Sequence, residues 1–338
     1  MKRILKYFTI RLLLTIPMIF ILLTLIFFVL RVMPADPVKS MLGAHAPERV
    51  IEQKRKELGL DKPILAQYVD YLKQLARFDL GKSMIMEQKV ITPIKDKLPA
   101  TLELIIFGLI IALVLGVFLG AYGANNRGTG KDTTIRLYGL IVFCIPAYWM
   151  GLMLQLIFGI WFDWLPIAGR TSSRVLVAEF NNTGFYLIDT LIAGNIPAFL
   201  DVLAHLVLPA LTLALILSGI FVRLTRANML DVLNNDYILA ARARGISEKK
   251  VVYKHALKNT MVPILTMLGM QFALLIANAV LTESTFSWPG MANLLVKRIH
   301  LRDYPTVQAI IILIAVMVSL SSLIVDLVYA WIDPRVEY

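Results

Sequence analysis

Residues 102–122 read LELIIFGLIIALVLGVFLGAY, and Glu103 is the only charged side chain among them. A membrane-spanning helix needs about 20 mainly apolar residues to cross the hydrocarbon core. The backbone finds no water there, so only a helix or a closed barrel can satisfy its N–H and C=O groups. The stretch lacks the alternation of apolar and polar residues that a barrel strand shows, and it therefore predicts a transmembrane helix.

Five further runs of this kind lie elsewhere in the chain, at residues 8–30, 137–161, 203–222, 262–281 and 307–331. Of the 338 residues, 58% are hydrophobic and 17% are charged, below the roughly one quarter of charged residues in soluble domains. The first run is too long for the core of a secretory signal and lacks a small-residue cleavage site, so we expect a retained helix. The sequence predicts an all-α, polytopic membrane protein with about six transmembrane helices.

The basic residues set the orientation, because Lys and Arg in short loops remain in the cytoplasm. With the N-terminus inside, the inner side receives three basic clusters, within residues 2–11, 127–136 and 223–258. The two shorter outer loops hold only Arg170, Arg174, Lys297, Arg298 and Arg302. The net charge of +11 is therefore interpreted as membrane orientation and not as nucleic-acid binding, and both termini are predicted to be cytoplasmic.

The first outer segment is predicted to fold as a small extracytoplasmic cap. Residues 48–58 have a helix-forming composition that stops at Gly59, and an amphipathic stretch follows at 64–78. The predicted organisation is a first transmembrane helix at 1–31, the cap at 32–99, and a core of five spans at 100–338. The second outer segment, 162–201, is expected to be an ordered loop.

A stripe of small residues runs along the second span, where Ala112, Gly116, Gly120 and Ala124 recur every four residues. Small side chains on one face let another helix approach closely. We expect this face to pack against a helix of this subunit or of a partner. Lining a transport pathway is the minority alternative.

Catalytic and cofactor motifs are missing from the sequence. The nearest approach to a phosphate-binding loop has Asn125 at the first glycine position and Asp132 at the hydroxyl position, with no strand before it. The four histidines are far apart in sequence, and the single Cys144 excludes an intrachain disulfide and a cysteine zinc cluster. We expect no catalytic residue, no bound cofactor and no metal site in this chain.

Three acidic residues lie at membrane depth, where ionisable groups are costly and are functional hypotheses by default. Glu103 and Glu283 fall near the outer ends of their spans, and Asp326 lies within the last span. For Glu103 and Glu283 we expect an interfacial structural role, with the lining of a pathway exit as the alternative. Asp326 is either part of the pathway or a hydrogen-bond partner for a neighbouring helix.

The most informative polar stretch is the loop at 235–259, in which residues 236–259 read DYILAARARGISEKKVVYKHALKN. Asn235 or Asp236 can cap a helix that Gly245 ends, and Ser247 can start a second helix. Ala240 and Ala241 are small, so another protein can come close, while Arg242 and Arg244 can meet acidic groups. The sequence predicts a bent helix pair that docks a cytoplasmic partner and transmits rigid motion to the spans.

This loop resembles the EAA loop of binding-protein-dependent ABC importer permeases, whose pattern is E-A-A, three residues, G, nine residues, I-x-L-P. Ala240, Ala241, Gly245 and Leu257 match at the required spacing. Leu239 stands in place of the acid of the pattern, His255 in place of the isoleucine and Lys258 in place of the proline. These departures are usual in the peptide-permease branch.

Further segments are similar to the B-type subunit of dipeptide and oligopeptide permeases, and together they cover essentially the whole chain. They are RVMPADP (31–37), LGLDKP (58–63), DLGKS (79–83), PATLE (99–103), LTESTFSWPG (281–290) and RDYPTVQ (302–308). One departure is Phe78, which stands where the family commonly has glycine.

The resemblance implies the type I permease fold of ABC importers, in a prokaryotic cell membrane. The chain would pair with a homologous C-type permease, two cytoplasmic ATPases that bind ATP and Mg²⁺, and an extracytoplasmic solute-binding protein. The loop at 235–259 would seat on one ATPase, with Ala240, Ala241, Arg242, Arg244, Gly245, Ser247 and Leu257 as its coupling residues. The outer cap and the 162–201 loop would receive the loaded binding protein.

Several alternatives stay open. Relatives of this branch also import nickel chelates and oligosaccharides, and the choice of cargo resides mainly in the binding protein. An ion-coupled secondary transporter predicts broken helices and midplane acids in matched halves, and neither pattern is evident. A membrane scaffold or receptor without transport activity would leave the helix, glycine, helix loop unexplained.

Overall fold

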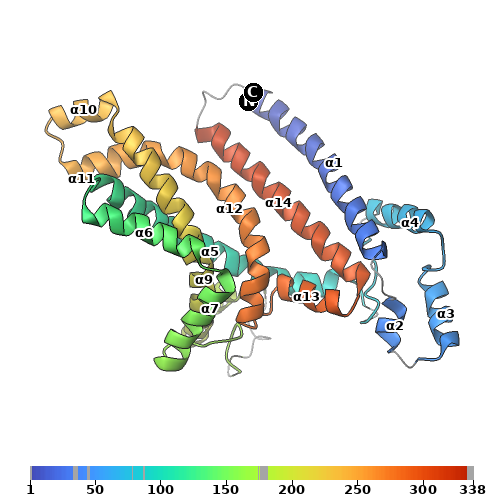
Figure 1. Cartoon of the computed structure of the whole chain (residues 1–338). Coiled ribbons are helices and arrows are strands. Elements are labelled where there is room, and N and C mark those ends of the chain that lie inside the picture. The colour runs from blue at the N-terminus through green and yellow to red at the C-terminus, as the bar shows by residue number, and fades with distance from the viewer. Residues whose placement is uncertain are drawn as a thin grey trace. The chain divides into compact units, whose positions relative to one another are not determined.

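The computed structural model describes residues 2–32, 37–43, 46–77, 79–86, 88–173, 175 and 182–332 (Figure 1). This part is almost wholly helical, and its only strand-like pairing is an isolated bridge between Lys82 and Lys89. The predicted all-α class is therefore confirmed. The chain divides into two compact units: unit 1 holds Met1–Phe8, Pro99–Pro289 and Leu320–Tyr338, and unit 2 holds Thr9–Leu98 and Gly290–Ser319.

Unit 1 is the larger helical unit. Its elements are most of α5 (Ile91–Asn125), α6 (Gly130–Cys144), α7 (Ala147–Leu154), the π-helix η1 (Gln155–Trp161), α8 (Tyr186–Ile192), α9 (Ile196–Leu233), α10 (Asp236–Ala243), α11 (Glu248–Lys250), the π-helix η3 (Val251–Ala256) and α12 (Leu257–Thr285). α9 is the central helix of the unit, since α6, α7, α8 and α12 all pack against it (Figure 1).

Close packing of α5 on α9 follows from the small-residue stripe. Ala112 and Ala124 are buried, a Cβ added to Gly116 would overlap Phe221, and one added to Gly120 would lie 2.6 Å from Cβ of Thr225. Glycine at these positions lets the two backbones approach more closely than any side chain would allow. The predicted packing of this face within the subunit is confirmed.

Unit 2 contains most of α1 (Lys2–Val32), α2 (Pro37–Leu42), α3 (Glu48–Glu57), α4 (Ile64–Ala76), α13 (Met291–His300) and the first half of α14 (Tyr304–Ile332). α3 and α4 are the predicted cap helices, and Gly59 takes the left-handed φ of +65° that ends the first of them. α2 had not been predicted. α4 is held to α1 by a 2.6 Å hydrogen bond between the hydroxyls of Thr24 and Tyr68. The location of these helices outside the membrane stays a prediction.

One predicted span is not a single helix. The run 137–161 is divided into α6 and the α7–η1 helix, which are bent by 105° at Ile145 and Pro146. Proline has no N–H to continue a helix, and it forces the preceding residue out of the helical region; Ile145 accordingly has an extended ψ of 129°. The prediction of one continuous helix over this run is wrong; the bent pair can still be one span.

The other predicted runs lie within single helices. Those at 102–122, 203–222 and 307–331 fall in α5, α9 and α14, each of which contains a stretch long and apolar enough to cross a membrane. The run 262–281 falls in α12, which bends by 55° next to Pro263, and the run 8–30 falls in α1. By length and composition, the described helices supply three spans, or five if each bent pair is one span. The number six stays a prediction.

Candidate functional site

The loop between α9 and α12 folds as a helix, a turn and a second helix. α10 ends at a turn in which Gly245 has a φ of +74°, and the N–H of Gly245 donates to the carbonyl of Arg242 at 2.9 Å. The chain then enters α11 and continues through η3 into α12. The predicted helix, glycine, helix arrangement is confirmed. Asn235 stands at the cap position of α10 but makes no side-chain cap hydrogen bond.

One face of the loop is fixed by an apolar core, here called the anchoring cluster. Ile238 and Ala241 of α10 lie three residues apart, on one helix face, and both are buried. They pack with residues of α5, the end of α9 and η3; these are Ala121, Ala124, Met229, Leu233, Val251, Val252 and Ala256. The loop is therefore a rigid extension of the helix ends and not a free surface segment.

The opposite face is exposed, and we call it the docking ridge; its residues are Leu239, Ala240, Arg242, Arg244, Gly245 and Ser247. Gly245 has open space where a Cβ would lie, with nothing within 4 Å. Arg242 donates to both carboxylate oxygens of Glu248, at 3.1 and 2.7 Å, and this pair ties α10 to α11 across the turn. The ridge thus combines the small residues Ala240 and Gly245 with basic residues beside them.

The structure divides the predicted coupling residues between these two faces. Ala240, Arg242, Arg244, Gly245 and Ser247 lie together on the docking ridge. Two predicted coupling residues do not: Ala241 is buried at 8% exposure, and Leu257 is partly buried against the anchoring cluster. Ala241 was expected, with Ala240, to let a partner come close, but it points inward because it shares a helix face with Ile238. The coupling role of the whole set stays a prediction.

Glu103 lies in a buried polar cluster of unit 1. Its carboxylate accepts hydrogen bonds from Arg170 Nη2 at 2.6 Å, from Arg170 Nε at 3.1 Å and from the backbone N–H of Leu187 at 2.9 Å. Arg170 also donates to the carbonyl of Gly184, and its guanidinium lies 3.6 Å from the centre of the Tyr186 ring. The geometry favours the structural role expected for Glu103, because the cluster fixes α8 and the segment before it to α5.

Glu283 and Asp326 are the other two acids that the sequence places at membrane depth. Glu283 is fully buried and accepts a hydrogen bond from the Thr101 hydroxyl, while Trp288 Nε1 donates to the carbonyl of Ala100 at 3.0 Å. The segments PATLE and LTESTFSWPG are therefore neighbours in unit 1. Asp326 lies in α14, but its side chain is outside the described residues. A pathway role for the three acids stays a prediction.

A second pair of distant sequence segments meets inside unit 2. Asp303 is fully buried, and it accepts hydrogen bonds from the Ser83 hydroxyl at 2.6 Å, the Met84 N–H at 3.0 Å and the Thr306 hydroxyl at 2.7 Å. This joint connects DLGKS with RDYPTVQ. The two motifs, some 220 residues apart, thus form one structural junction.

Two ionic contacts of unit 1 were not predicted. Arg170 was noted only as an outer-loop charge, and Asp132 only as a failed match to a phosphate loop. Arg226 donates to both oxygens of Asp132, at 2.6 and 2.8 Å, and ties the first turn of α6 to α9. An acid in the first turn of a helix, such as Asp132, is expected to stabilise that end of the helix. Its partner Arg226 lies 94 residues away, and a single sequence gives no indication that the two residues meet.

Known protein families match nearly the whole chain. Residues 112–338 match the family described as the binding-protein-dependent transport system inner membrane component, and residues 4–105 match the N-terminal region described for such membrane components. The chain belongs to this family. The match makes the protein a multi-pass membrane component of a transport system that works with a binding protein.

Curated relatives extend along nearly the full chain. The di/tripeptide transport system permease protein of Pseudomonas aeruginosa (strain UCBPP-PA14) is 40% identical, covering 97% of each chain. The dipeptide transport system permease protein of Alkalihalophilus pseudofirmus is 38% identical, over 97% of this chain and 98% of the relative. The glutathione transport system permease protein of Escherichia coli O6:H1 is 34% identical over 99% of each. The binding-protein-dependent transport family therefore accounts for both units.

Proposed function

We propose that this chain is the B-type permease subunit of an ATP-driven importer of short peptides. It forms half of the translocation pathway, beside a homologous C-type permease. Two ATPase subunits in the cytoplasm bind ATP and Mg²⁺, and a binding protein delivers the peptide from the outer side. The chain itself has no catalytic role, and both of its termini are cytoplasmic.

The observation that supports this proposal is the docking ridge on the anchoring cluster. A subunit that converts closure of the ATPases into motion of its spans needs an exposed contact surface that is rigidly supported on its opposite face. Leu239 is 53% exposed, while Ile238 beside it is fully buried among residues of three other elements. A close-packed cluster of this kind passes on displacement with little compression.

The test is the substitution Gly245→Val in the assembled complex. Valine resists the positive φ of this position, at a cost of about 1–2 kcal/mol, and it places a branched side chain on the docking ridge. Gly128→Val is the matched control, because Gly128 is also exposed, has a φ of +78° and has no atom within 4 Å of an added Cβ. Both variants carry the same strain, and only the first alters the ridge.

The expected result is that Gly245→Val inserts normally but loses at least tenfold in peptide-stimulated ATPase activity and in uptake by proteoliposomes. Gly128→Val should keep most of both activities. Equal activities of the two variants would refute the assignment of the docking ridge as the coupling surface.

The proposed cargo rests on the relatives, whose names refer to dipeptides, di/tripeptides and glutathione. We propose a di- or oligopeptide for this chain, with nickel chelates and oligosaccharides as the competing cargoes. The complex should be isolated from its native membrane with its binding protein, and the affinity of that protein for the three ligand classes measured by calorimetry. Tight binding of a nickel chelate or an oligosaccharide, without peptide binding, would overturn the peptide assignment and leave the coupling surface unaffected.

A further inference from the structure

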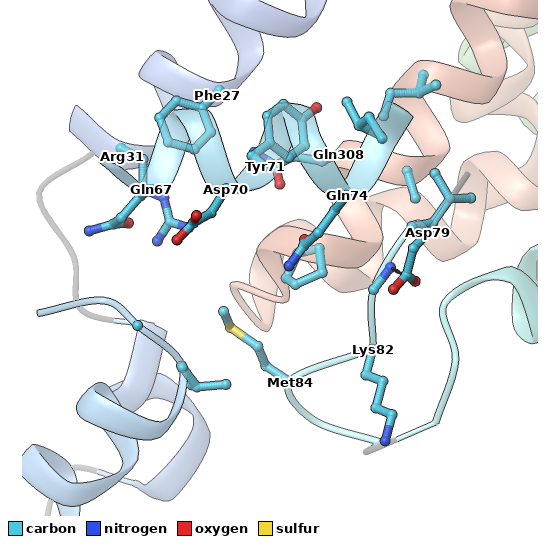
Figure 2. Close-up of a pocket in the computed structure, with 18 of the residues that line it drawn as sticks. Phe27, Arg31, Gln67, Asp70, Tyr71, Gln74, Asp79, Lys82, Met84 and Gln308 are labelled. Atoms are coloured by element: carbon cyan, nitrogen blue, oxygen red, sulfur yellow. Dashed lines mark hydrogen bonds between the residues drawn. The ribbon is translucent and has the colours of Figure 1, made fainter. Parts of the chain in front are cut away.

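Unit 2 contains a cavity of about 390 Å³ to which the proposed function assigns no role (Figure 2). Its walls come from the ends of α1 and α3, from the turn at 58–62, from α4, from the loop at 79–84 and from the first turns of α14. Figure 2 shows polar side chains of α4 along one rim, with Met84 and Lys82 on the opposite rim. This volume is large enough for a small ligand, since ligand pockets begin at about 300 Å³.

Arg31 brings a positive charge to the cavity. Its guanidinium carbon lies 5.4 Å from the centre of the Phe27 ring and 5.8 Å from that of Tyr304, so aromatic rings hold it in place. Within the described part of the chain, no carboxylate lies within ion-pair distance of Arg31, and its Nε has no hydrogen-bond partner. A partly buried charge without a counter-charge is unfavourable, and an anion in the cavity would relieve it.

The acidic residues of the same wall are already engaged and do not serve Arg31. Lys62 donates to Asp70 at 2.8 Å, and this hydrogen bond lowers the pKa of the Asp70 carboxyl. Glu57 pairs with Lys54 at 3.2 Å, and Asp79 accepts the N–H of Gly81 at 2.9 Å. Among the described residues, Arg31, Lys82 and Asp79 line the cavity without an ion-pair partner, which leaves one positive charge in excess along its wall.

Three further unpartnered polar atoms belong to residues that line this cavity. They are Gln67 Oε1, Tyr71 OH and Gln308 Nε2, and with Arg31 Nε they make four of the seven such atoms found among the described residues. All four atoms belong to side chains that border the cavity. The concentration of unmet hydrogen-bonding groups around one space indicates that a polar molecule belongs there.

The roles of these groups define the chemistry of the ligand. Gln67 Nε2 already donates to the carbonyls of Leu60 and Lys62, which fixes its amide and leaves Oε1 as an acceptor. Burial raises the pKa of Tyr71 to about 12, so its hydroxyl keeps a proton that it can donate. Gln308 lies one helical turn beyond Tyr304, on the face of α14 that Arg31 approaches. Three groups can thus donate and one accepts.

We propose that this cavity binds a small ligand that carries a carboxylate or phosphate group next to a hydrogen-bond donor. The oxyanion accepts from Arg31 and Gln308, and the donor of the ligand bonds to Gln67. Two sources offer this chemistry. One is a free zwitterion such as a dipeptide, and the other is the headgroup of an anionic phospholipid beside α1, whose Leu25 and Val29 are exposed.

The test measures ligand protection in the purified complex, without binding protein, by hydrogen exchange of the segment 57–84. One arm titrates dialanine in detergent, and the other compares nanodiscs of phosphatidylglycerol with nanodiscs of phosphatidylcholine. The variants are Arg31→Gln and Gln308→Leu. Lys62→Gln is the control, because Lys62 is a cation of the same wall that is already paired and 52% exposed.

We expect saturable protection in one arm, weakened at least tenfold by Arg31→Gln and by Gln308→Leu and less than twofold by Lys62→Gln. The arm that responds identifies the source. Absence of protection in both arms, or equal weakening by the Lys62 control, would overturn the proposal and mean that water alone fills the cavity. So would a marked loss of stability of the ligand-free protein in Arg31→Gln, since Arg31 would then already be paired within the chain. None of these results depends on ATPase coupling, so they are separate from the test of the docking ridge.

Discussion

The buried contact between Glu103 and Arg170 gives the most direct prediction, because a structural role and a pathway role for Glu103 predict opposite effects on stability and on uptake. The side chains are only 2% and 4% exposed, and three N–H groups point at one carboxylate. Removing one partner of a buried ion pair typically costs about 3–5 kcal/mol, because the remaining charge stays buried and unpaired. Glu103→Gln keeps the shape of the side chain and removes only its charge.

A double-mutant cycle separates the pair from its surroundings. We expect Glu103→Gln and Arg170→Met each to lower the free energy of unfolding by about 3–5 kcal/mol, and the double variant to lose less than the sum, since no unpaired charge remains. The exposed pair of Arg242 and Glu248 is the internal standard. Its side chains are 37% and 51% exposed, and it should couple by no more than about 1 kcal/mol.

The assay is unfolding of the purified protein in mixed detergent micelles, with uptake by proteoliposomes measured per folded complex. A structural role predicts that Glu103→Gln loses stability while the folded fraction still transports. The reasoning would be refuted if Glu103→Gln cost less than about 1 kcal/mol, coupled no more than the exposed pair, and yet abolished uptake. Glu103 would then act on the pathway itself.

Two further predictions concern packing and long-range joints. Gly116→Ala should cost about 1–3 kcal/mol, because the added methyl overlaps Phe221 and forces α5 and α9 apart, whereas Gly130→Ala, with nothing within 4 Å, should be neutral in the same unfolding assay. Asp303→Asn should cost about 1.5–3 kcal/mol through weakened hydrogen bonds to Ser83 and the next backbone N–H. It should also speed hydrogen exchange at residues 82–86, and unchanged exchange there would contradict the role of this joint.

The helices themselves could be predicted from the sequence, because hydropathy and length are local properties. The break in the run 137–161 could not. Proline alone does not mark it, since Pro146 stands at a 105° bend while other prolines lie inside continuous helices; these are Pro17, Pro99 and Pro209. Whether a proline bends a membrane helix depends on which neighbours satisfy the freed backbone groups, and that information is tertiary.

The candidate site likewise combines features that local sequence predicts with features that depend on tertiary contacts. Gly245 could be predicted, because a left-handed turn between two helical segments has a local signal. The inward orientation of Ala241 was also within reach of the sequence, since it follows Ile238 by three residues on one helix face. The partners of Glu103 and Asp303 were not, because they lie 67 and 220 residues away and no periodicity connects them.

The anchoring cluster and the glycine contacts together suggest how the docking ridge can act on the membrane helices. Gly116 and Gly120 hold α5 against α9, and Ala121 and Ala124, in the following turn of α5, belong to the anchoring cluster that also contains Ile238 of α10. The two long helices are therefore joined to each other and to the ridge by close-packed contacts. A push on the ridge cannot be absorbed within the loop, and it must move the ends of α5 and α9 together. In the proposed coupling, the buried face of the loop would determine how far the motion travels, and the exposed face would determine which partner supplies it.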